Sequence, residues 1–174
     1  MIPLEPLPRP ADVNGILATL RRRGVRFMLV GGLAGMAHGS SYPTYDVDIA
    51  YDRKPRNLER LAEALTEMDA RLRGAPRDVP FLLDAKTLGN GLNFTFDTKF
   101  GPFDILGELR GVGPYERVAK AAVSARIEGT EVEVISLDHL IAMKAAAGRE
   151  KDRVMVAEYI AIADQQRRLA DESR

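Results

Sequence analysis

The spacing of hydrophobic residues alternates between two periods along this chain. Apolar residues three or four positions apart, the period of an amphipathic helix, recur in several segments. They predict helices at 12–24, 33–39, 55–72, 137–147 and 151–168. Asp12 is expected to cap the first of these helices, Pro55 begins the third, and Gly148 separates the last two.

Patterns typical of strands lie between these helices. They predict a buried strand at 25–30, a strand with alternating polar and apolar residues at 46–51, and two hairpins at 92–106 and 123–135. The turn of the first hairpin is expected at residues 97–102, which places Asp97 in a turn. Helices that flank a mixed, mostly antiparallel sheet describe an α/β domain that leans towards α+β.

The chain is expected to divide into three segments. Residues 1–10 contain four prolines and predict an extended N-terminal arm. Residues 11–135 are expected to form the core, and residues 136–174 a short pair of helices packed on it. A length of 174 residues is typical of one compact domain.

Composition narrows the class of function. The chain has 25 basic and 25 acidic residues, so any site for a polyanion must be a local patch. It has no cysteine, which excludes disulfides, zinc–thiolate sites and thiol catalysis. The N-terminal stretch lacks the form of a secretion signal, and no apolar run is long enough to span a bilayer. A cytoplasmic protein with no membrane partner is therefore expected.

Asp46 and Asp48 are the most informative polar residues of the sequence. They alternate with Val47 and Ile49, so a strand here points both carboxylates to one face and the apolar side chains into the core. Two adjacent carboxylates repel each other unless a cation or a proton lies between them. The pair therefore predicts a site for Mg²⁺ or Mn²⁺. The alternative is an edge strand whose acidic face is simply hydrated.

A third carboxylate and a pair of glycines support the metal interpretation. Asp104 lies between Phe103 and Ile105 in a later strand pattern, so it joins the first two aspartates if the two strands pair. Gly31 and Gly32 follow the buried strand, where glycine allows a sharp turn and a close approach of the backbone to phosphate. An ordinary strand-to-helix turn is the alternative for these glycines.

The same glycines also imitate a dinucleotide-binding loop. Gly31, Gly32 and Gly35 loosely match its fingerprint, and Asp52 lies where a ribose-binding acid is expected. However, the helix between the two predicted strands is too short for a crossover between parallel strands. The dinucleotide interpretation is therefore the weaker one.

Lys144 occupies an unusual place on its predicted helix. It continues the apolar stripe that contains Leu140 and Ile141. A lysine in that position either reaches solvent at the helix end or meets an anion, such as a nucleotide phosphate or an active-site carboxylate. Arg149 and Asp152, three positions apart, either form an ordinary helix pair or line the same site.

Taken together, these residues resemble the nucleotidyltransferase superfold, which includes DNA polymerase beta and kanamycin nucleotidyltransferase. Within it, the chain is most similar to small bacterial proteins of the AbiEii toxin type, which carry a Gly-Gly turn, an Asp-x-Asp strand and a later lysine helix followed by an Arg-x-x-Asp-like element. The resemblance spans roughly residues 25–160. The residues that carry it are Gly31, Gly32, Thr44, Asp46, Asp48, Ile49, Asp104, Lys144, Arg149 and Asp152.

The resemblance implies an Mg²⁺-dependent enzyme that transfers a nucleotide from an NTP to a hydroxyl of RNA, a protein or a small molecule. It implies that Asp46 and Asp48 bind the metals, and that Asp104 binds the catalytic metal or accepts the proton of the attacking hydroxyl. It implies a triphosphate cradled by the glycine pair and neutralised by Lys144. A toxin or antitoxin partner protein is also implied.

Gly32 departs from the pattern of this superfold, in which a serine hydroxyl often binds a phosphate oxygen at that position. Backbone amides or the hydroxyls of Ser40, Ser41 and Thr44 are then expected to take that role. The alternative function is a non-catalytic module of the same fold that binds a nucleotide or a partner. The three aspartates argue against this alternative, and Gly32 argues for it.

Overall fold

The computed structural model describes residues 9–76 and 78–173, so most of the arm expected at residues 1–10 lies outside the described residues. Its centre is a seven-stranded sheet in the order β3-β4-β5-β2-β1-β9-β8. These strands are β1 (Phe27–Val30), β2 (Val47–Tyr51), β3 (Arg71–Leu72), β4 (Asn93–Thr98), β5 (Gly101–Leu106), β8 (Val123–Ile127) and β9 (Thr130–Val134). A separate small sheet pairs β6 (Glu108–Leu109) with β7 (Gly113–Pro114).

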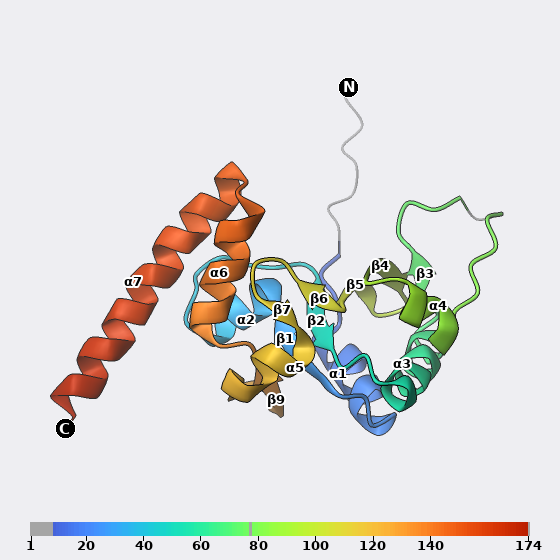
Figure 1. The fold of residues 1–174 in the computed structure, drawn as a ribbon, viewed down its shortest axis with the longest axis horizontal. Helices are drawn as coiled ribbons and strands as arrows, with labels where there is room; N and C mark the ends of the chain where they lie inside the picture. The colour runs from blue at the N-terminus through green and yellow to red at the C-terminus, as the bar shows by residue number, and fades with distance from the viewer. Residues whose placement is uncertain (1–8, 77, 174) are drawn as a thin grey trace.

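Helices flank the sheet. They are α1 (Val13–Arg22), α2 (Gly31–Ala37), α3 (Pro55–Glu67), α4 (Ala85–Asn90), α5 (Tyr115–Val118), the 3-10 helix η1 (Ala119–Ala121), α6 (Leu137–Ala147) and α7 (Glu150–Glu172). Figure 1 shows α6 and α7 as an antiparallel pair at one end of the molecule, with α3 and α4 at the other. No helix within the described ranges is long and apolar enough to cross a membrane.

The sheet is mixed and mostly antiparallel, as predicted. Two pairs of neighbours are parallel, β1 with β9 and β2 with β5, and the remaining pairs are antiparallel. β2 lies between β5 and β1, so the acidic strand is central and not the hydrated edge strand of the alternative interpretation. β1 and β2 are antiparallel, which also excludes the parallel crossover of a dinucleotide-binding unit.

Local sequence signals explain most element boundaries. The side chain of Asp12 caps α1 by accepting a hydrogen bond from the N–H of Gly15 at 2.9 Å. Gly148 adopts a left-handed conformation with φ of 68° and ends α6. The core lies between the sheet and its helices. All four residues of β1 are buried in it, and α3 packs one apolar face against it.

Two predicted boundaries are wrong. The helix expected to reach residue 72 ends at Glu67, and Leu72 lies in β3. The reason is Asp69, whose positive φ of 54° cannot continue a right-handed helix although the apolar spacing does continue. Asp97 lies in β4 and not in a turn, because the β4–β5 connection is only Lys99 and Phe100.

Candidate active site

Three carboxylates meet where β2 runs beside β5. Asp48 and Asp104 are partners in the parallel register of these strands, and Asp46 directly precedes β2. One carboxylate oxygen from each of the three lies within 4.8 Å of the other two. In the part of the chain that the structure describes, no other group of three or more acidic or histidine side chains is arranged this closely for a metal.

The electrostatics of this group favour a bound cation. Burial, together with the negative charges of Asp46 and Asp104, raises the pKa of Asp48 to about 7. Burial also raises the pKa of Asp104, although the nearby guanidinium of Arg73 opposes that rise. Three oxygen donors that repel one another suit a hard divalent cation such as Mg²⁺, so the residues present fit the predicted metal.

Arg73 is a member of this group that sequence reasoning missed. Its Nη2 lies 2.9 Å from Asp104 Oδ1 and donates to the Phe96 carbonyl at 2.8 Å, and its Nε lies 3.1 Å from Asp97 Oδ1. Arg73 directly follows the two-residue strand β3, where no periodic pattern marks it. Only the pairing of β4 with β5 brings the guanidinium to Asp104.

Gly31 is required by the close approach of Asp48. It has a positive φ of 63°, and a Cβ added there would collide with the Asp48 carboxylate. The glycine therefore lets the backbone at the start of α2 lie directly against one of the three aspartates. The close approach predicted for this turn was to phosphate, whereas the neighbour that the structure shows is the Asp48 carboxylate.

Gly32 is required by Thr44. A Cβ at Gly32 would lie 2.7 Å from Thr44 Oγ1, so a serine cannot enter this position unless Thr44 moves. The same Thr44 hydroxyl donates a hydrogen bond of 2.9 Å to Asp46 Oδ1. A hydroxyl therefore does stand beside residue 32, and it comes from the loop before β2.

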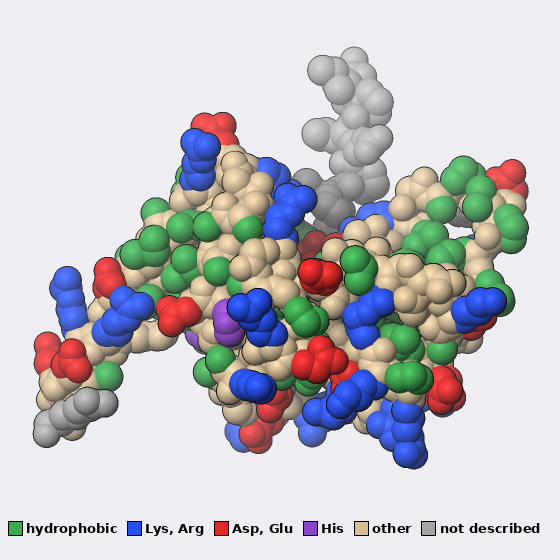
Figure 2. Space-filling view, viewed as in Figure 1, with side chains coloured by type: hydrophobic (Ala, Val, Ile, Leu, Met, Phe, Trp, Pro, Cys, Tyr) green, Lys and Arg blue, Asp and Glu red, His purple; other side chains and the backbone are tan. Residues whose placement is uncertain are grey.

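These residues open into one cleft of about 450 Å³ between the sheet and the α6–α7 pair. The carboxylates form one wall, and basic side chains from α6, α7 and the segments next to them form another. Figure 2 shows Lys and Arg side chains at the junction of α6 and α7. The basic residues that line the cleft are Arg110, Lys144, Arg149 and Lys151. Of these, Arg110 and Lys151 were not singled out from the sequence, and neither were two polar residues of the lining, Asn93 and Glu108.

Asp152 stands behind this basic wall and does not line the cleft. Its carboxylate is fully buried and lies 3.4 Å from Lys144 Nζ and 2.7 Å from Arg149 Nε. Burial alone would raise the pKa of Asp152, but the contacts with Arg149 and Lys144 lower it overall. Asp152 therefore holds the two cations at the cleft edge, and Lys144 does not simply escape into solvent.

Ser40 and Ser41 lie outside the cleft. Both hydroxyls donate to the carboxylate of Glu158 on α7, at 2.6 Å and 2.7 Å. The two hydroxyls thus bind α7 and not the three aspartates. Thr44 is the one predicted hydroxyl residue that lines the cleft.

Asp52 has a structural role in this fold. It is 1% exposed, and its carboxylate accepts a hydrogen bond from the N–H of Lys54 at 3.0 Å just before α3. Its other oxygen lies 3.6 Å from Arg26 Nη1. These contacts fix the end of β2 to the start of α3, so Asp52 is not displayed to a ligand.

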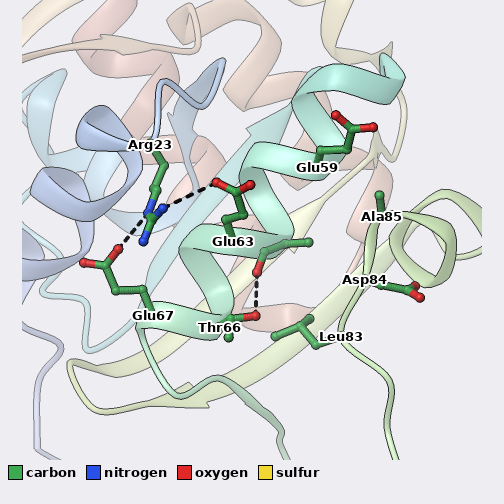
Figure 3. Close-up of a pocket in the computed structure, with 9 residues that line it drawn as sticks. Arg23, Glu59, Glu63, Thr66, Glu67, Leu83, Asp84 and Ala85 are labelled. Atoms are coloured by element: carbon green, nitrogen blue, oxygen red, sulfur yellow. Dashed lines mark hydrogen bonds and ion pairs between the residues drawn. The ribbon is translucent and has the colours of Figure 1, made fainter.

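A second hollow of about 520 Å³ lies beside α3, with α1 and the start of α4 as its neighbours (Figure 3). Arg23 crosses its edge to pair with Glu63 at 3.4 Å and Glu67 at 2.7 Å. Its acidic side chains are thus partly neutralised, and none belongs to a group that can hold a metal. The cleft with the aspartates, although smaller, is the candidate active site.

Comparison with known structures identifies the architecture. Neither protein-family models nor curated proteins gave a match to the sequence. Among solved structures, the lincosamide antibiotic adenylyltransferase LnuA, solved with lincomycin, superposes with a TM-score of 0.59 at 12% identity, over 88% of this chain and 99% of that one. TM1012 of Thermotoga maritima, a proposed nucleotidyltransferase, has a TM-score of 0.51 at 14% identity, over 92% and 91%.

The antibiotic-resistance factor ANT(2'')-Ia also superposes, with a TM-score of 0.50 at 14% identity, over 92% of this chain and 95% of its own. Identities this low establish a shared fold and nothing finer. Each superposition extends over most of both chains. The chain therefore has the nucleotidyltransferase fold.

Proposed function

We propose that this protein is a metal-dependent nucleotidyltransferase, which transfers a nucleoside monophosphate from an NTP to a hydroxyl acceptor. The observation that carries the proposal is the meeting of Asp46, Asp48 and Asp104 opposite a basic wall in one cleft. The carboxylates suit a divalent cation, and the basic wall suits a triphosphate. The fold supports the same reaction class, although fold alone does not determine chemistry.

The residues predicted for the site divide into metal ligands and phosphate ligands in this proposal. Asp46, Asp48 and Asp104 would hold Mg²⁺ or Mn²⁺, and the bound ion would neutralise charge on the phosphate oxygens. Gly31 and Gly32 leave the backbone open to the triphosphate, and the hydroxyl of Thr44 stands where a side chain at residue 32 would otherwise lie. Lys144 and Arg149, held by Asp152, bind the phosphates from the other wall.

The reaction then needs little covalent help from the protein. The acceptor oxygen forms a bond to the α-phosphorus as the bond to the pyrophosphate oxygen breaks, and pyrophosphate leaves. Asp104 accepts the proton of the acceptor hydroxyl, while Arg73 keeps its carboxylate in place at 2.9 Å. The rate enhancement comes mainly from positioning and from charge neutralisation.

Three kinds of acceptor are compatible with this proposal. The names of LnuA and ANT(2'')-Ia concern antibiotics, which supports a small molecule. The resemblance to AbiEii-type proteins supports RNA or a protein acceptor, together with a toxin or antitoxin partner and a cytoplasmic location. A transfer assay that offers each kind of acceptor in a separate pool distinguishes the three.

The decisive experiment is transfer of label. Purified protein is incubated with each α-³²P-labelled NTP, Mg²⁺ or Mn²⁺, and either total RNA, lysate protein or a small-molecule extract. Wild type is expected to label one pool, and Asp46→Asn is expected to lose the label. Asp171→Asn is the matched control, because Asp171 is an exposed aspartate near the end of α7 that lies outside the cleft lining and outside the group of three. Equal labelling by wild type and Asp46→Asn contradicts the proposal.

One observation favours a second candidate, a non-catalytic module that binds a nucleotide or a partner protein. Arg73 already neutralises Asp104, so one oxygen of the third carboxylate is engaged before any ligand binds. In that case NTP and Mn²⁺ raise the melting temperature of the protein, but no label is transferred to any acceptor. A shift that Asp48→Asn abolishes, together with label transfer, supports the enzyme.

A further inference from the structure

The loop over residues 39–46 delivers two residues of the proposed site, Thr44 and Asp46. It joins α2 to β2 and contains no helix or strand until β2 begins. Near its end, the N–H of Ala11 donates to the carbonyl of Tyr45 at 2.8 Å. At the start of the loop, the N–H of Ser40 donates to the carbonyl of Gly35 in α2 at 2.9 Å, but residues 41–43 pair with no strand and need a further anchor.

Glu158 of α7 provides that anchor. Its carboxylate accepts three hydrogen bonds, from Ser40 Oγ at 2.6 Å, from the N–H of Ser41 at 2.8 Å and from Ser41 Oγ at 2.7 Å. The Ser40 hydroxyl in turn accepts from the N–H of Tyr42 at 3.2 Å. These bonds, led by the one from Ser40, lower the pKa of Glu158. A charged carboxylate therefore holds both serines and the next peptide of the loop.

The helix that carries Glu158 is itself firmly placed. The neighbouring residue, Tyr159, is fully buried, and its hydroxyl lies so close to Gly35 of α2 that a Cβ there would collide with it. Met155, one helical turn before Glu158, lines the cleft. Asp152, near the start of the same helix, contacts Lys144 and Arg149 of the basic wall. The helix α7 thus contacts both walls of the cleft. It contributes to the basic wall directly, and it reaches the wall of carboxylates through the loop over residues 39–46.

We infer that Glu158 is a positioning residue, which holds the loop over residues 39–46 so that Thr44 and Asp46 face the metal and the phosphates. This inference rests on the proposed function, because it concerns the same site. Glu158 lies too far along α7 to line the cleft and acts through Ser40 and Ser41. The two serines therefore serve the site indirectly, by fixing the loop, and do not contact the nucleotide.

A positioning role differs from a general stabilising role in what its loss changes. Glu158 and Ser40 are half-buried, Ser41 is exposed, and none of the three belongs to the hydrophobic core, so their removal opens no cavity in the core. We expect the loop alone to become mobile. Mn²⁺ affinity and kcat then fall, whereas the KM for NTP changes little, because the basic wall of Lys144 and Arg149 is retained.

The test measures Mn²⁺ binding by calorimetry in Glu158→Ala and in the double variant Ser40→Ala/Ser41→Ala. Both are expected to raise the Kd for Mn²⁺ about tenfold and to lower the melting temperature by only a few degrees. Glu158→Gln is expected to restore much of the affinity, because its amide oxygen accepts from Ser41 while its amide nitrogen donates to Ser40. Glu172→Ala, an exposed glutamate at the end of α7, is the control.

Hydrogen exchange of the loop gives a second readout. The amides of Ser41 and Tyr42, whose hydrogen bonds depend on Glu158, are expected to exchange faster in Glu158→Ala than in wild type, while those of β1 and β2 keep their protection. Wild-type binding of Mn²⁺ combined with unchanged affinity in Glu158→Ala overturns the positioning role and leaves the proposed function intact. Failure of wild type to bind Mn²⁺ overturns both.

Discussion

Asp48 and Asp104 stand side by side as register partners on the parallel strands β2 and β5. In a parallel pair, matched residues point to the same face of the sheet, so the two carboxylates face the same cleft. Their mutual repulsion adds to the effect of burial in raising the pKa of Asp48 to about 7. Protons and divalent cations are therefore expected to compete for the space between these two carboxylates.

Metal binding is expected to weaken below pH 7. Asp48 carries a proton in that range, and the proton must leave before the carboxylate can bind a cation. The apparent Kd for Mn²⁺ is expected to rise about tenfold for each pH unit below 7, as for any ligand that displaces one proton. Calorimetric titration between pH 5.5 and 8 measures this. A Kd that stays constant across the range contradicts it.

The stability of the metal-free protein is expected to fall as pH rises, whereas its affinity for metal rises. The pKa of Asp48 is about 7 in the folded chain against an ordinary 3.8, so between these values the folded state binds more protons than the unfolded state. The contribution of Asp48 to the free energy of unfolding therefore falls as pH rises from about 4 to 7. Urea unfolding should show Asp48→Asn more stable than wild type at pH 8, with a smaller advantage at pH 5. An advantage that does not change with pH rules this out.

Replacing Gly31 with alanine is expected to destabilise the fold and abolish Mn²⁺ binding. The change adds a strained left-handed alanine, at about 1–3 kcal/mol, and a collision with the Asp48 carboxylate. Gly129→Ala is a matched control, because Gly129 also has a positive φ, 82°, but has nothing within 4 Å of an added Cβ. Chemical denaturation of both variants separates the collision from the strain. Equal losses of stability mean that Asp48 does not press against Gly31.

Introducing at residue 32 the serine that the resemblance to this superfold implies is expected to lower the Mn²⁺ affinity of this protein. Gly32→Ser brings a side chain into the space of Thr44, so Thr44 and its hydrogen bond to Asp46 must shift. The double variant Gly32→Ser/Thr44→Gly regains the space, because it also removes the Thr44 Cβ that would lie 2.6 Å from a Cβ at residue 32, and it keeps one hydroxyl beside the glycine turn. We expect the single variant to lose about tenfold in Mn²⁺ affinity and the double variant to recover most of it. Additive losses in the double variant contradict this steric coupling.

Loss of Lys144 is expected to weaken nucleotide binding and to leave metal binding nearly unchanged. Its ammonium lines the cleft and is held 3.4 Å from the buried Asp152. We expect Lys144→Ala to raise the Kd of a non-hydrolysable NTP analogue about tenfold, from the loss of one charge-assisted contact with phosphate. Arg153→Ala, an exposed residue of α7 outside the cleft lining, is the control for lost positive charge. Equal effects of the two variants show that only the overall charge matters.

Local periodicity was enough to predict most of the fold. The hairpin of β8 and β9 lies within one residue of its expected strands, because alternation and the Gly129 turn are both local signals. The alternation around Asp46 and Asp48 likewise predicted a strand with both carboxylates on one side. Strands and tight turns depend on residues that are close in sequence, so the spacing of polar and apolar residues is enough to predict them.

Contacts between distant segments could not be predicted in this way. Arg73 reaches Asp104 and Glu158 reaches Ser41 through the packing of separate elements, and neither residue carries a periodic signal of its own. Ser41 illustrates the resulting ambiguity, because a serine near a glycine turn suits a phosphate and a carboxylate equally well. The structure provides Glu158 as the partner. Short elements such as α4 and β6 were missed because a few residues contain too little of either period.

The pairing of β2 with β5 also determines when in folding the site can exist. Residues 52–100 intervene, so these strands join only after a long segment of chain has closed into a loop, which costs chain entropy before any contact is gained. Before β2 pairs with β5, a chain that has already formed its helices and hairpins holds Asp46 and Asp48 together but keeps Asp104 apart from them. Capture of a divalent cation during refolding therefore marks the moment at which the two halves of the sheet come together.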